Sequence, residues 1–226
     1  MDTSATAVPK LRRSQSEMHA PLAGVAAVIL FLVGVFIHDV VGDTPDGGAP
    51  ATEFARYYQE EDGSIWFASI FVFIGLALFM WFVGELRATL ARLEGGVGRL
   101  AATAHAGGIA VAVLIFAGFG TQVSAAILVS DRDAPMNPEV AVGFWWVGDG
   151  MIVAAFYAAA VLVAACAMVM LRIDCGVLAP RWFGWVSVAL AVLLLLPWIN
   201  WFGFVAFAIW VAIMSLLLWR SARIEA

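Results

Sequence analysis

The chain has 226 residues, of which 63% are apolar and 13% charged, and its mean hydropathy is +0.95. A soluble domain is usually about 45–50% apolar and about 25% charged. These values exclude a water-soluble globular domain, a disordered chain and a disulfide scaffold. The fold class they predict is all-α, a polytopic membrane helix bundle, because a helix satisfies its own backbone hydrogen bonds in lipid.

The positions of the charges predict where the helices lie. Five stretches contain no Asp, Glu, Lys or Arg: 18–38, 63–84, 100–130, 150–171 and 182–219. About 20 residues of helix cross a hydrocarbon core about 30 Å thick. The last stretch is too long for one crossing, and the segment PWINW at 197–201 interrupts it with a proline and a turn-forming asparagine. The sequence therefore predicts six transmembrane helices, at 22–42, 65–84, 104–130, 147–171, 181–196 and 201–219.

Basic residues gather on one side of this arrangement. Lys and Arg are enriched in cytoplasmic loops. Ten of the twelve basic residues fall in the two tails and in the second and fourth loops, whereas the other loops carry only Arg56 and Arg132. We expect a disordered cytoplasmic tail at 1–20, a six-helix transmembrane domain at 21–220 and a cytoplasmic C-terminal tail at 221–226. Both termini are then cytoplasmic, in the plasma membrane (the inner membrane of a bacterium).

The loops carry further structure. Residues 51–61 of the first outer loop are expected to form a short interfacial helix, with Phe54, Tyr57 and Tyr58 on the membrane side. The second loop is expected to continue the second span as a helix to about Glu94, before Gly95 and Gly96 break it. Tryptophan lies at predicted span ends in nine of ten cases, as expected for interfacial anchors.

Five polar residues lie at a similar depth near the outer surface. They are His38 and Asp39 at the end of the first span, Gln122 in the third, Asp149 between two glycines at the start of the fourth, and Asn200 between the fifth and sixth. Ionisable groups inside a membrane are costly and are candidates for function. The hypothesis is an outward-opening polar pocket that suits a cation or an amine. The alternative is that the terminal groups reach the lipid headgroups and that Gln122 bonds across helices.

The sequence contains no recognisable motif for catalysis, metal binding or cofactor binding. The chain has no G-x-S-x-G, H-E-x-x-H or phosphate-binding loop. Cys166 and Cys175 are nine residues apart, which is not a metal or redox spacing. His38 and His105 lie near opposite faces of the membrane and cannot share a haem iron. We therefore expect no catalytic residue, no metal site and no cofactor, and the sparse basic residues predict no nucleic-acid partner.

Three segments carry a resemblance to a known group. They are FVGELRA at 82–88, EGG at 94–96 and LAPRWFGW at 178–185, and the likeness extends over about residues 22–220. The chain resembles uncharacterised six-span integral membrane proteins of actinobacteria, a domain-of-unknown-function family. This resemblance implies a fold and brings no activity and no catalytic residue.

Three functions remain open at this stage. The first is a structural or accessory membrane component, in a homo-oligomer or a membrane complex, with the lipid bilayer as its surroundings. The second is a transporter or ligand-binding membrane protein for a small solute or cation, which uses the outer polar pocket. The third is a membrane-embedded enzyme that modifies lipid.

Overall fold

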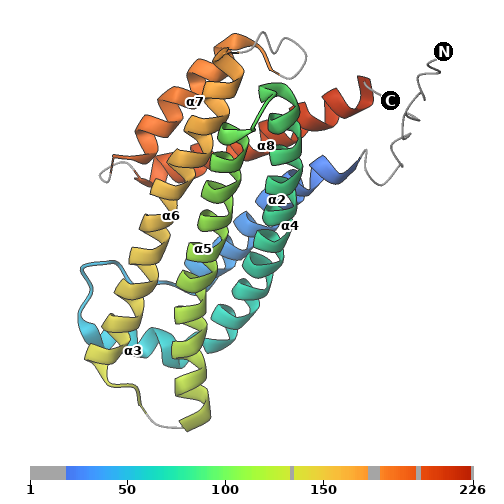
Figure 1. The fold of residues 1–226 in the computed structure, drawn as a ribbon. Coiled ribbons are helices and arrows are strands. Elements are labelled where there is room, and N and C mark those ends of the chain that lie inside the picture. Colours follow the sequence, from blue (N-terminus) through green and yellow to red (C-terminus); the bar gives the residue numbers. More distant parts are fainter. Residues whose placement is uncertain (1–18, 133–134, 173–178, 197–199, 225–226) are drawn as a thin grey trace, which may run out of the picture.

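The computed structural model describes residues 19–132, 135–172, 179–196 and 200–224, and its regular elements there are all helical (Figure 1). In chain order they are η1 (Ala20–Leu22), α2 (Ala23–Phe36), η2 (Ile37–Val41), α3 (Ala51–Glu60), α4 (Asp62–Glu94), α5 (Arg99–Arg132), α6 (Pro138–Arg172), α7 (Arg181–Leu194) and α8 (Asn200–Ile224). Within the described residues, five helical segments are long and apolar enough to cross a membrane: Ala20–Val41, Asp62–Glu94, Arg99–Asp131, Pro138–Arg172 and Phe202–Arg223. The protein is an all-α, multi-pass membrane protein.

The three central helices are longer than a bilayer requires. Helices α4, α5 and α6 have 33, 34 and 35 residues, or about 50 Å each at 1.5 Å per residue. The helical extension expected after the second span is confirmed, because α4 continues to Glu94. The Glu94 carboxylate then accepts the backbone N–H groups of Leu100 and Ala101, both at 3.0 Å, which caps the first turn of α5.

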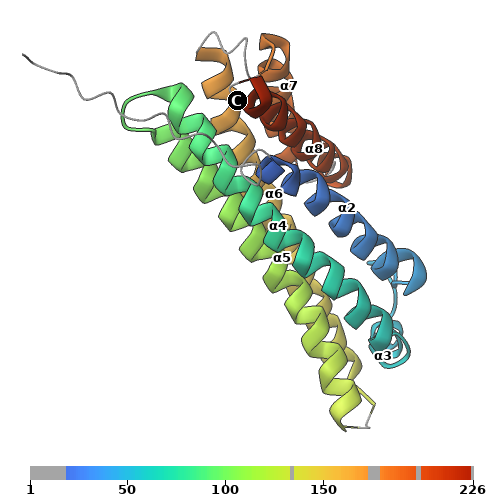
Figure 2. The same ribbon diagram turned by 90° about the vertical axis from the view of Figure 1, so that its right-hand side faces the viewer.

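The fifth predicted span is shorter than expected. Helix α7 has 14 residues, about 21 Å, which is less than the hydrocarbon core of about 30 Å. It ends at Leu194, three residues before Pro197, whose ring disfavours helical backbone in the residue before it. Figures 1 and 2 show that α7 and the beginning of α8 both stop short of the end of the molecule that carries α3.

Helix α3 forms as predicted, but its aromatic face does not face the membrane. Phe54 is 1% exposed, Tyr57 4% and Tyr58 0%. These side chains pack in a small core with Val123 of α5 and Ala141 of α6. The reason is that α5 and α6 offer an apolar surface at this end of the bundle, so the aromatic face is buried against protein.

Glycines allow α5 and α6 to approach closely. A Cβ atom on Gly107 would lie 2.8 Å from the backbone nitrogen of Leu162, and one on Gly118 would lie 2.9 Å from the carbonyl oxygen of Gly148. Small residues at membrane helix interfaces bring backbones together in this way. The close approach of Gly118 to Gly148 sets the distance between α5 and α6 beside the candidate site.

Candidate functional site

Four of the five residues predicted from the sequence line one cavity. His38 and Asp39 of η2, Gln122 of α5 and Asp149 of α6 border a space of about 630 Å³. The fifth, Asn200, begins α8, and its side chain lies outside the described residues.

The cavity occupies the angle between three helices. Helix α5 forms its back, through Phe119 and Gln122, while α2 with η2 and α6 form the two walls. Residues 44–47 border its outer end, and Phe204 of α8 borders its inner end. Among the described lining residues none belongs to α7, because that helix stops short of this end of the bundle (Figure 2).

A local change of helix type presents His38 and Asp39 to the cavity. Residues 37–41 form a π-helical turn, in which the Gly42 N–H bonds to the Ile37 carbonyl at 3.0 Å. This wider turn ends the helix and sets the directions of the side chains within it, and π turns are frequent at functional sites. Here the His38 side chain is 8% exposed and the Asp39 side chain 41%. The turn therefore buries the imidazole and leaves the adjacent carboxylate open to the cavity.

His38 links the Asp39 carboxylate to a buried phenol. Its Nδ1 lies 2.8 Å from Asp39 Oδ1, and its Nε2 lies 3.3 Å from the hydroxyl of Tyr57. Burial raises the pKa of Tyr57 above its ordinary value, and Tyr58, Asp39 and Glu61 add to this electrostatically. The phenol therefore stays protonated and can donate to Nε2. With Nδ1 donating to Asp39 and Nε2 accepting from Tyr57, the imidazole satisfies both bonds and holds Asp39 in place.

Gln122 is likewise held by a hydrogen bond from a buried tyrosine of α3. The Tyr58 hydroxyl donates to Gln122 Oε1, and burial raises the pKa of Tyr58, which keeps the phenol a donor. Gln122 is 5% exposed. Its Nε2 lies near Gly148, since a Cβ atom on that glycine would be 3.2 Å from it. The bond across helices that the sequence offered as an alternative is therefore present, and Gln122 also lines the cavity.

Asp149 differs from these three residues because no partner for it is seen among the described residues. Its side chain is half-buried on the α6 wall. In the part of the chain that the structure describes, no N–H or O–H group donates to its carboxylate and no basic side chain pairs with it. A carboxylate withdrawn from water without compensation attracts a cationic or hydrogen-bond-donating ligand.

The described lining combines acidic and aromatic groups. Asp39, Asp46 and Asp149 contribute carboxylates, and no Lys or Arg lies among these lining residues. Five aromatic rings complete the walls, from Phe31, Phe119, Trp145, Phe156 and Phe204. Carboxylates together with aromatic faces recognise organic ammonium groups, through charge and through cation–π attraction.

The described residues support a metal ion as the ligand less well than an organic cation. Among the described residues no group of three or more His, Cys, Asp or Glu side chains is placed to hold one. The cavity offers separate carboxylates and ring faces, which is the chemistry of an organic cation.

Several site residues were missed from the sequence. Trp145, predicted as an interfacial anchor, stacks on His38 with ring centroids 6.4 Å apart. Tyr57 and Tyr58 were assigned to the membrane side. The i, i+3, i+4 spacing of Phe54 with these tyrosines did mark a buried helix face, but not what would cover it. No local pattern distinguished Asp46 from the other acidic residues of its loop.

Comparison with known proteins identifies no family for this chain. No family model matches the chain, and no match is found among curated proteins or solved structures.

Proposed function

We propose that this membrane protein binds a small organic cation in the cavity between α2, α5 and α6. The observation that carries the proposal is Asp149, a half-buried carboxylate without a described partner in an acidic, aromatic-walled cavity. His38 and Tyr57 keep a second carboxylate, Asp39, on the opposite wall. A ligand between the two walls would therefore meet a negative charge on each side.

Ligand binding is favoured over a purely accessory role. An accessory subunit needs apolar outer faces and no unpaired carboxylate, whereas such a group costs stability unless a ligand uses it. We propose that ligand binding is the primary activity, because the cavity ends at Phe31 and Phe204. Transport of the same ligand would be an additional activity.

The proposed orientation places this cavity on the outer side of a plasma membrane. The acidic first loop and α3 lie at one end of the bundle, and the α4–α5 turn and the end of α8 lie at the other (Figures 1 and 2). The positive-inside rule then supports cytoplasmic termini. In the proposed six-helix topology, α7 enters from the cytoplasmic side and α8 returns to it. Kinship with the six-span actinobacterial group is part of this proposal.

Binding of phenyltrimethylammonium to the purified full-length protein in lipid nanodiscs tests the proposal. Calorimetric titration should give saturable binding, and Asp149→Asn should weaken it at least about tenfold, since it removes the unpaired charge at unchanged size. Glu139→Gln is the matched control, because Glu139 is an exposed acid on the same helix and does not line the cavity. Absence of saturable binding, or equal binding by both variants, would contradict the proposal.

A further inference from the structure

We infer that the ligand is an amphipathic cation, whose head occupies the polar cavity and whose hydrocarbon chain occupies a second, apolar cavity directly inward of it. This inference rests on the proposed function. It adds the chemical class of the ligand, namely an ammonium group that carries an alkyl chain.

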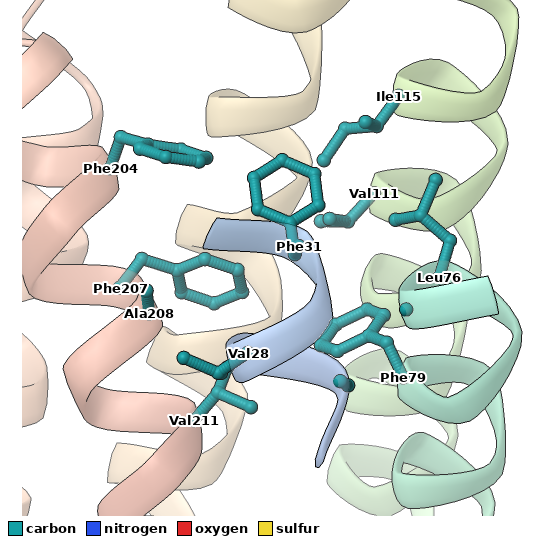
Figure 3. Close-up of a pocket in the computed structure, with 12 residues that line it drawn as sticks. Val28, Phe31, Leu76, Phe79, Val111, Ile115, Phe204, Phe207, Ala208 and Val211 are labelled. Carbon is teal, nitrogen blue, oxygen red and sulfur yellow. The ribbon is translucent and has the colours of Figure 1, made fainter. Parts of the chain in front are cut away.

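The second cavity, here called the chamber, is a partly open apolar hollow between four helices. It has a volume of about 50 Å³ and is lined by 12 residues, all apolar, from α2, α4, α5 and α8. Figure 3 shows Phe31 of α2 between Phe204 and Phe207 of α8 on one side and Ile115 and Val111 of α5 on the other. An apolar lining of this kind favours contact with apolar groups over contact with water.

Two aromatic rings separate the chamber from the polar cavity. Phe31 and Phe204 line both spaces, and their ring centroids lie 5.3 Å apart at an interplanar angle of 54°. The partition therefore consists of side chains and not of backbone. Rotation of these two rings would join the spaces without moving a helix, so a chain attached to a bound head has a direct path inward.

The volume of the chamber limits how much of the ligand's alkyl chain can be buried in it. A space of about 10–15 Å³ on this measure holds one water, so the chamber accommodates a few methylene groups. Each methylene buried should strengthen binding about fourfold. We therefore expect affinity to rise over the first few carbons of the chain and then to level off.

The surroundings of the polar cavity also suit an amphiphile. Its walls belong to α2 and α6, and no described residue of α7 lines the side away from α5. In the proposed orientation this side faces the outer leaflet of the bilayer. An amphipathic cation concentrates at that interface, with its charge at headgroup level and its chain in the hydrocarbon.

A series of alkyltrimethylammonium ions, from tetramethyl to octyl, tests the inference. Each ion is titrated below its micellar concentration into the full-length protein in nanodiscs, with empty nanodiscs as the blank. Ala208→Leu places a larger side chain at the chamber wall and should abolish the gain with chain length while it preserves tetramethylammonium binding. Ile209→Phe, which adds volume at a position 55% exposed on the same helix, is the control and should keep the gain. Phe31→Ala, a second variant, removes one of the two rings that both cavities share. It should steepen the gain in affinity per carbon, whatever it does to tetramethylammonium binding, and an unchanged gain would contradict the inference.

Each outcome separates this inference from the proposed function. Tetramethylammonium binding that depends on Asp149, with equal affinity for every chain length, would overturn the inference and leave the proposed function standing. A gain with chain length that is the same in wild type, Ala208→Leu and Ile209→Phe would come from partition into lipid and would also overturn it. If no member of the series binds, both the inference and the proposed function are contradicted.

Discussion

At the scale of single residues, polar side chains in this protein divide into paired and unpaired groups. Gln122 is bonded to Tyr58, and His38 is bonded to both Asp39 and Tyr57. Unmade hydrogen bonds in a low-dielectric interior are costly, so these pairs hold the cavity walls in one arrangement. Asp149 stands apart because no described group compensates its charge, and the proposed function rests on this carboxylate.

The Tyr58 hydroxyl is expected to contribute to stability. Tyr58→Phe leaves the buried Gln122 carbonyl oxygen without its donor and should lower the free energy of unfolding by about 1–3 kcal/mol. Tyr157→Phe is the matched control, because Tyr157 is 42% exposed and no hydrogen bond to it is seen among the described residues. Unfolding in mixed micelles with increasing denaturing detergent measures both variants. Equal stability of the two would contradict the role given to this bond.

At the scale of elements, packing decides what each helix does. Helix α3 has the amphipathic pattern of an interfacial helix, yet it covers the outer ends of α5 and α6 and supplies both tyrosines of the site. Helix α7 is too short to cross the bilayer. Its partner α8 carries Trp210, whose indole N–H donates to Ser187 of α7 at 2.9 Å, so the buried polar atom of this midmembrane tryptophan is satisfied.

Two glycines on α5 should respond in opposite ways to alanine. Gly107→Ala places a methyl group 2.8 Å from the Leu162 nitrogen and 3.0 Å from the Ala158 carbonyl, both backbone atoms of α6. It should destabilise the protein by about 1–3 kcal/mol, the usual cost of overpacking. Gly120→Ala meets no atom within 4 Å and should be neutral or stabilising by up to about 1 kcal/mol, since alanine favours helix. Thermal unfolding in detergent measures both, and a Gly107→Ala variant as stable as Gly120→Ala would contradict the close crossing.

At the scale of the whole molecule, the two ends of the bundle differ in charge and in shape. One end carries α3, the acidic loop and the residues 44–47 that border the cavity, and the other carries the α4–α5 turn and the end of α8, with Arg92, Arg99 and Arg223. An acidic mouth raises the local concentration of cations before they bind. The asymmetry therefore agrees with a site that takes a cation from the outer side.

Cysteine accessibility tests this orientation. In a background with Cys166→Ala and Cys175→Ala, Gly48→Cys should react with a membrane-impermeant maleimide on intact cells. Val97→Cys, in the α4–α5 turn and 89% exposed, should react only after the membrane is permeabilised. The reverse pattern would invert the proposed topology and place the cavity on the cytoplasmic side.

The class of protein, the positions of the long helices and the gathering of polar residues near one end could all be read from the sequence. These features are local, because a run without charges and the spacing of polar residues along a helix can be counted directly. His38, Asp39, Gln122 and Asp149 were recognised in this way, and the structure brings all four to one cavity.

The contacts of those residues, in contrast, became evident from the packing of the helices. The spans are apolar on nearly every side, so the helical period does not reveal which face meets which neighbour. The burial of α3, the tyrosine bonds to His38 and Gln122, and the apolar chamber behind Phe31 each depend on such choices. They follow from close helix crossings at glycine, which bring together groups that lie far apart in the chain.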